Sequence, residues 1–156
     1  MLQENSALPA FALPSTVDSE RTLTNAHFAG RAFVLFIYPK DATSGCTLEA
    51  QQFAALYPEF QKHGVEIVGL SRDALSAHRK FIAAQNLPFA LLSDKEQTTL
   101  RAWDLIVNAT MYGKPVTKVA RTTIAVDAKG VVQRIWRNVT PAGHAQEVLD
   151  WVQLNF

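Results

Sequence analysis

The chain has 156 residues, of which 48% are hydrophobic and 19% are charged, and its formal net charge is +1 at pH 7. This length suits one domain and is short for two, so we expect residues 1–156 to form a single domain. The near-neutral charge excludes the positive excess that a nucleic-acid or anionic-membrane partner requires. The first residues have no basic region and are interrupted by Pro9 and Pro14. We therefore predict neither a signal peptide nor a membrane anchor, and we expect a cytoplasmic protein.

The first half of the chain predicts alternating strands and helices. The continuous apolar run over residues 33–38 indicates a buried central strand. After a turn over residues 40–45, apolar residues at helical spacing predict a helix, which Pro58 either kinks or divides and which Gly64 ends. A strand over 65–71, a helix through residues 75–82 and an extended segment over 89–93 follow.

The second half predicts a short helix over 95–103 and then, because residues 108–118 show little periodicity, a loop. The apolar segments 122–127 and 131–137 flank the short connection Ala128-Lys129-Gly130, which predicts an antiparallel hairpin. Thr140 and Pro141 suit the N-cap and first turn of a last helix. We therefore expect an α/β fold with a mixed central sheet and helices on both faces.

Cys46, the only cysteine, follows the predicted central strand, and sites in open α/β sheets gather beyond the carboxyl ends of such strands. With Thr43 or Ser44 as the cap, Cys46 lies in the first helical turn, where free N–H groups and the helix dipole favour a thiolate. The dipole alone is too weak, so a cation is needed. Arg121 opens an otherwise apolar strand and is the candidate. On these residues alone, a buried and inert cysteine stays the alternative.

Pro39, Thr43 and Cys46 reproduce the P-x-x-x-T-x-x-C pattern of the peroxiredoxins, thiol peroxidases with a thioredoxin-like fold. The chain most resembles their bacterioferritin comigratory protein group, also called peroxiredoxin Q, through FIYPKDATSGCTLEA, SAHRKF, LPFALLSD, YGK and ARTTIAVDAKG. The resemblance implies that Cys46 is the peroxidatic cysteine, that Thr43 offers its hydroxyl to the peroxide and that Pro39 shields the thiolate from water. It further implies that Arg121 stabilises the thiolate and the peroxide, and that Glu49 holds Arg121 in place.

The chain departs from many members of this group because it has no resolving cysteine. Gln51 stands five residues after Cys46, where many members have one, and the helix around residues 81–85 has none either. The resemblance therefore implies a one-cysteine peroxidase, an antioxidant enzyme of cell redox homeostasis that reduces hydrogen peroxide and small organic hydroperoxides through a sulfenic acid at Cys46. An external thiol, from thioredoxin, glutaredoxin or glutathione, would regenerate it.

Two other functions compete with this one. A peroxide sensor would pass oxidation from Cys46 to a partner protein, whereas a disulfide reductase would need a C-x-x-C pair, which is absent. We expect no cofactor, no nucleic-acid or membrane partner, and a monomer with a weak dimer as the alternative. We also expect no metal and assign the histidines to the surface or the core, because no metal-ligand spacing joins His27, His63, His78 and His144.

Overall fold

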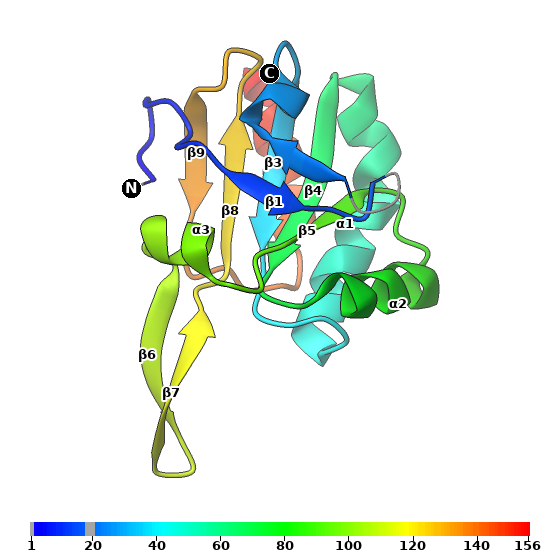
Figure 1. Ribbon diagram of the computed structural model, residues 1–156. Coiled ribbons are helices and arrows are strands. Elements are labelled where there is room, and N and C mark those ends of the chain that lie inside the picture. The colour runs from blue at the N-terminus through cyan, green and yellow to red at the C-terminus, as the bar shows by residue number, and fades with distance from the viewer. Residues whose placement is uncertain (1, 18–20) are drawn as a thin grey trace.

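The computed structural model describes residues 2–17 and 21–156 and is built around a five-stranded mixed sheet (Figure 1). Its strand order is β5-β4-β3-β8-β9. The first three of these, β3 (Ala32–Ile37), β4 (Val65–Ser71) and β5 (Ala90–Ser93), are parallel. The remaining two, β8 (Thr122–Val126) and β9 (Val132–Trp136), run antiparallel to their neighbours. The predicted mixed sheet, with the strand after residue 32 at its centre, is confirmed.

Two apolar layers cover the two faces of this sheet. Alternate residues of β3 point to opposite faces, so Val34 and Phe36 join one buried cluster while Leu35 and Ile37 join the other. On the first face pack α1 (Ser44–Lys62), α2 (Leu75–Gln85) and α4 (His144–Asn155). On the second pack the small strands β1 (Ala12–Pro14) and β2 (Thr22–Thr24) with the short helices η1 (Asn25–Phe28) and α3 (Thr98–Ala102). Helices therefore lie on both faces, as predicted, and the double burial of β3 explains its uninterrupted apolar sequence.

The structure decides two helix predictions. Of the two alternatives for Pro58, division of the helix is wrong, because α1 runs through Pro58 to Lys62. The last helix begins at His144 rather than after Thr140, and its N-cap is Gly143 with φ of +78°. Thr140 and Pro141 instead belong to the connection from β9, where the carbonyl of Pro141 accepts a hydrogen bond from the backbone N–H of His144. No helix in the described part of the chain is long and apolar enough to cross a membrane.

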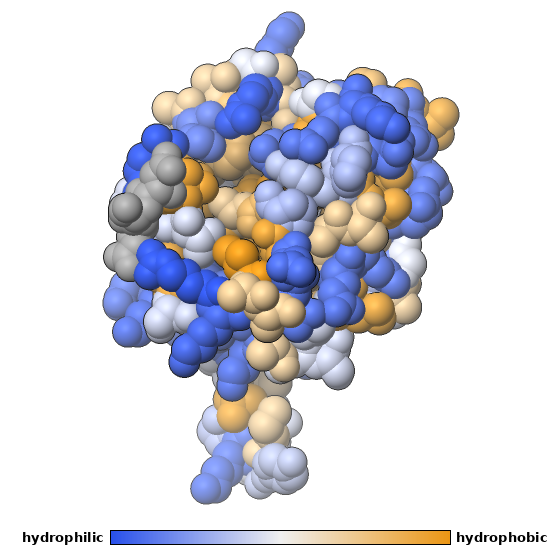
Figure 2. Space-filling view, turned by 90° about the vertical axis from the view of Figure 1, so that its right-hand side faces the viewer, coloured by the Kyte–Doolittle hydropathy of each residue, from blue (hydrophilic) through white to orange (hydrophobic). Residues whose placement is uncertain are grey.

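The segment predicted as a loop is a two-stranded hairpin, β6 (Ile106–Met111) and β7 (Lys114–Val119). Its two turn residues, Tyr112 and Gly113, have φ of +52° and +76°, as the tight turns of hairpins require. The hairpin projects from the body of the molecule, and its surface mixes hydrophilic and hydrophobic residues (Figures 1 and 2). Residues 106–118 are all exposed or only partly buried, so the sequence there has no reason to alternate, and the periodicity signal is missing.

Candidate active site

The pairing of β3 with β8 brings Cys46 and Arg121 together although 75 positions separate them. Ile37, the last residue of β3, pairs with Thr122, the first residue of β8. Arg121, which precedes β8, therefore lies at the end of β3, where the chain turns into the loop that leads to α1. Cys46 is the third residue of α1, so its place in the first helical turn is confirmed.

Arg121 forms contacts with both Cys46 and Glu49. Its Nη2 lies 3.3 Å from Cys46 Sγ, and its Nη1 donates to Glu49 Oε1 at 2.7 Å. Cys46 and Glu49 are three residues apart on one face of α1, and their exposed fractions are 1% and 0%. A Cβ on Gly45 would lie 3.4 Å from Arg121 Nη2, so the glycine leaves room for the guanidinium. The guanidinium of Arg121, predicted to need an anionic partner, therefore faces the Glu49 carboxyl group and the Cys46 sulfur.

Burial and neighbouring charges have opposite effects on the pKa values of Glu49 and Arg121. Burial raises the pKa of Glu49 to about 7, and the charge of Arg121 offsets only part of that rise. Burial lowers the pKa of Arg121, but the neighbouring Glu49 and Cys46 outweigh it, so this pKa lies above its ordinary value. The guanidinium is thus always charged. Glu49 Oε2 is buried and has no hydrogen-bond partner among residues 2–17 and 21–156.

Thr43 and Pro39 lie in the loop between β3 and α1. Thr43 occupies the N-cap position of α1, but its hydroxyl donates to the carbonyl of Lys40 at 2.8 Å and caps no described N–H group of the helix. Its oxygen can therefore still accept a hydrogen bond. Ala42 has φ of +61°, a left-handed conformation that costs a residue other than glycine about 1 to 2 kcal/mol. The loop is therefore held in a shape that its own backbone does not favour.

Sequence reasoning missed a buried polar network beside this loop, formed by Tyr38, Asp41 and His78. The Tyr38 hydroxyl donates to Asp41 Oδ1 at 2.6 Å, and His78 Nδ1 lies 2.7 Å from Asp41 Oδ2. His78 is indeed a core residue, as one of our two alternatives had it, but it is hydrogen-bonded to the active-site loop. No spacing rule links a loop aspartate to a histidine 37 positions later, so this contact had no signal in the sequence.

Asp41 and His78, together with Asp73, also place metal-ligating atoms within 4.8 Å of one another. Each of these side chains is already hydrogen-bonded within the protein: Asp73 Oδ2 accepts from the backbone N–H of Asp41 at 2.9 Å, and His78 Nε2 lies 2.8 Å from the carbonyl oxygen of Leu92. The cluster therefore has protein partners where a metal ion would need open ligands.

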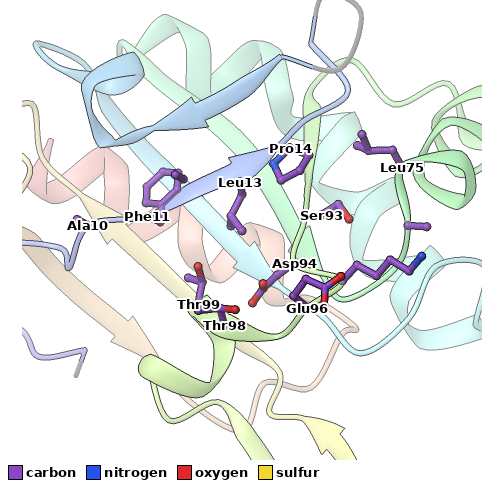
Figure 3. Close-up of a pocket in the computed structure, with 13 residues that line it drawn as sticks. Ala10, Phe11, Leu13, Pro14, Leu75, Ser93, Asp94, Glu96, Thr98 and Thr99 are labelled. Carbon is purple, nitrogen blue, oxygen red and sulfur yellow. The ribbon is translucent and has the colours of Figure 1, made fainter.

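A separate cavity of about 770 Å³ lies between β1, the start of α2 and the segment that leads from β5 to α3 (Figure 3). Leu13, Pro14 and Leu75 line it together with Ser93 and Asp94 at the end of β5. Cys46 is not one of the 13 described residues around it. The cavity is therefore separate from the contact between Cys46 and Arg121.

Comparison with known proteins places this arrangement in a family. Residues 5–135 match the model of the AhpC/TSA family. Peroxiredoxin Bcp of Xanthomonas campestris is 43% identical over 144 residues, which cover 91% of this chain and 90% of the relative. The chloroplastic peroxiredoxin Q of Populus jackii is 37% identical over 97% of this chain and 68% of its own length.

Solved structures agree with this assignment. The bacterioferritin comigratory protein of Xanthomonas campestris, for which alkyl peroxide reduction activity is described, superposes with a TM-score of 0.85 at 39% identity, over 92% of this chain and 90% of that one. A peroxiredoxin Q variant from the same organism gives a TM-score of 0.89 at 37% identity, over 97% and 99% of the two chains. The thioredoxin-like fold and the family resemblance are thereby confirmed. The chain belongs to the AhpC/TSA family and, within it, to the thiol-dependent peroxidases of the Bcp and peroxiredoxin Q group.

Proposed function

We propose that Cys46 is the peroxidatic cysteine of this enzyme and that it reduces hydrogen peroxide and small organic hydroperoxides. The observation that carries this proposal is the position of Arg121, which lies 3.3 Å from the sulfur and is fixed on its other side by Glu49. A permanent cation at this distance favours the thiolate, which is the nucleophilic form of cysteine.

In the peroxide step the thiolate attacks the terminal oxygen of the peroxide. The S–O bond forms as the O–O bond breaks, so that sulfur is oxidised to the sulfenic acid and the peroxide is reduced. The departing alkoxide or hydroxide takes up a proton and leaves as an alcohol or water. Negative charge moves from sulfur to the departing oxygen, and the planar guanidinium of Arg121 can hydrogen-bond to both atoms during this transfer.

The remaining site residues act by position. Because the hydrogen of the Thr43 hydroxyl is directed to Lys40, its oxygen can accept a hydrogen bond from the O–H of the peroxide and orient it. Pro39, half-buried in the same loop, has no N–H group and limits the access of water to the thiolate. Glu49 fixes the direction of the guanidinium through the 2.7 Å hydrogen bond.

The second half of the cycle uses an external thiol, because the chain has no other cysteine. One thiol attacks the sulfenic sulfur to give a mixed disulfide and water, and a second thiol releases Cys46 and forms the reductant's disulfide. We propose thioredoxin, glutaredoxin or glutathione as this reductant. We propose further that residues 1–156 act as one domain and that the protein works as a monomer in the cytoplasm.

Peroxide consumption tests the proposal when it is measured with each reductant in turn: thioredoxin with its reductase, glutathione with glutaredoxin, and dithiothreitol. We expect many turnovers with at least one of them and none for Cys46→Ser. Consumption of a single equivalent with all three would instead identify a sensor that passes its oxidation to a partner. Equal activity of Cys46→Ser would disprove the role of the thiol.

A further inference from the structure

The loop that carries Pro39 and Thr43 is anchored to the body by the buried side chains Tyr38, Asp41 and His78, which we call the loop anchor. Asp41 Oδ1 accepts a hydrogen bond from the Tyr38 hydroxyl at 2.6 Å, and Asp41 Oδ2 lies 2.7 Å from His78 Nδ1. The exposed fractions of the three residues are 0%, 6% and 0%. Such bonds are strong because water does not compete for them.

Two members of the loop anchor, His78 and Tyr38, are held in a defined role by their surroundings. His78 Nε2 donates to the carbonyl of Leu92 at 2.8 Å, which ties α2 to β5. The 2.7 Å contact between His78 Nδ1 and Asp41 Oδ2 then ties α2 to the active-site loop as well. Burial, assisted by the nearby Asp41 carboxylate, raises the pKa of Tyr38 well above its ordinary value, so its hydroxyl stays a donor.

The backbone of Asp41 is held as well. Its N–H donates to Asp73 Oδ2 at 2.9 Å, and Ser93 Oγ donates to the carbonyl of Asp73 at 2.6 Å. The next residue, Ala42, has the unfavourable φ of +61°, and Thr43 follows at the N-cap of α1. The strained residue therefore lies directly between the anchored aspartate and the threonine that faces the peroxide, and the anchor keeps it in place.

The burial of Cys46 limits the approach of the reductant. Cys46 is 1% exposed, yet an external thiol must approach its sulfur in line with the S–O bond that it breaks. The sulfenic oxygen adds an atom to a site where Arg121 already lies 3.3 Å from the sulfur. The first turn of α1 or the loop before it must therefore move before the sulfur can be reduced.

We propose that Tyr38, Asp41 and His78 are positioning residues that set the balance between the two halves of the reaction. With the anchor closed, Thr43 and the first turn of α1 are arranged for the peroxide. With the anchor open, the loop relaxes at Ala42 and Cys46 becomes accessible to the external thiol. This inference rests on the proposed role of Cys46. Its consequence is that a weaker anchor slows the peroxide step and accelerates the thiol step.

Tyr38→Phe tests this with the smallest change, since it removes one hydroxyl and keeps the ring packed. We expect the rate constant for sulfenic acid formation to fall about fivefold, and that for reduction of the sulfenic acid by dithiothreitol to rise by a similar factor, as loss of one buried hydrogen bond implies. Asp41→Asn and His78→Gln should shift both constants further in the same directions. Both steps are followed by rapid quenching and mass spectrometry.

Tyr57→Phe is the matched control, because the Tyr57 hydroxyl also donates to a carboxylate at 2.6 Å, that of Glu66, outside the active-site loop. It should change neither constant. Opposite shifts in the anchor variants cannot come from general damage, which lowers both. If Tyr38→Phe leaves both constants unchanged, or lowers both, while the native protein turns over peroxide, the anchor is only structural. If the native protein forms no sulfenic acid at Cys46, the proposed function itself fails.

Discussion

Arg121 is one residue that links two groups able to carry negative charge. The guanidinium is planar, with donors at fixed angles, so Nη1 can bond Glu49 while Nη2 faces Cys46. Its position before β8 fixes the backbone, and Glu49 fixes the far end of the side chain. The long side chain therefore loses its conformational entropy when the protein folds, and the guanidinium is already in place when a peroxide binds.

Arg121→Lys keeps the positive charge but removes the planar guanidinium and its donors at fixed angles. A lysine amine can approach either Glu49 or Cys46 but cannot hold the geometry of both, so we expect the rate constant for sulfenic acid formation to fall by about tenfold or more. Stopped-flow measurement with excess peroxide gives this constant. Arg134→Lys is the control, since Arg134 is exposed over the ring of Trp136 and should not affect the rate. An unchanged rate in Arg121→Lys would show that charge alone is sufficient.

The raised pKa of Glu49 predicts how the free energy of unfolding depends on pH. Its pKa rises from 4.5 to about 7 on folding, so the folded state binds this proton more tightly than the unfolded state. Stability is therefore lost as pH rises through this window, by about 3 kcal/mol in total. Urea unfolding at pH 5 and pH 8 should show this loss in a Cys46→Ser background, in which the thiol does not titrate. The loss should be absent when Glu49→Gln is added.

Glu59→Gln provides the comparison for that experiment. Glu59 lies in the same helix, and its carboxylate pairs with Lys62 at 3.0 Å, with the two side chains 44% and 70% exposed. Its removal should leave the pH dependence as it was. If the free energy of unfolding falls between pH 5 and pH 8 by the same amount with and without Glu49→Gln, Glu49 is ionised in the folded state throughout this range.

At the scale of elements, α1 carries the site at its first turn and a proline near its other end. Pro58 is exposed and has no N–H group for the carbonyl one turn before it. Proline is about 3 kcal/mol less favourable than alanine inside a helix, and its stiffness in the unfolded chain offsets part of this. We expect Pro58→Ala to raise the free energy of unfolding by about 1 to 2 kcal/mol in urea titrations.

Lys80→Ala, at an exposed position inside α2, controls for the general effect of alanine in a helix and should change stability by less than about 0.5 kcal/mol. Peroxide activity should be native in both variants, because Pro58 lies more than three turns from Cys46. A Pro58→Ala protein no more stable than the native one would show that α1 gains no hydrogen bond at that point.

Elements with a buried face were predictable from the sequence, and those without one were not. The run over residues 33–38 marked β3 because both of its faces meet the core. Residues 108–118 of the β6–β7 hairpin are nowhere fully buried and were predicted as a loop, although Tyr112 and Gly113 form a tight turn within them. The pairing of Cys46 with Arg121 could be predicted from two unusual features of the sequence. The only cysteine follows the central strand, and a charged residue opens an otherwise apolar strand. The Asp41–His78 contact is made by tertiary packing alone.

At the scale of the whole molecule, we expect the redox cycle to depend on how firmly the start of α1 is attached to its surroundings. Arg121, before β8, binds Glu49, and Gln51 Nε2 donates to Gln85 Oε1 of α2 at 2.6 Å. Gln51 occupies the position at which the family resemblance implies a resolving thiol in many members. In this protein that position instead joins two helices, which favours keeping α1 wound throughout the cycle.

Gln51→Cys tests how firmly α1 is held. Five residues of helix span about 7.5 Å and rotate the two side chains apart, whereas a disulfide needs α-carbons within about 7 Å. The bond can form only if the first turns unwind, which breaks the Arg121–Glu49 contact. The substitution also removes the hydrogen bond to Gln85. We therefore expect a disulfide between Cys46 and the introduced thiol to form after peroxide treatment, but slowly.

Mass spectrometry with dimedone trapping follows the outcome over time. In the native protein the sulfenic acid of Cys46 should persist and then advance to the sulfinic acid in excess peroxide, because no second thiol competes. The Gln51→Cys protein should resist that overoxidation once its disulfide is formed. Gln61→Cys, at an exposed position of the same helix, offers a thiol too distant to react within the chain and should be overoxidised like the native protein. A free thiol at position 51 beside a sulfinic acid at Cys46 would mean that α1 does not unwind, and that the loop before it must provide the access.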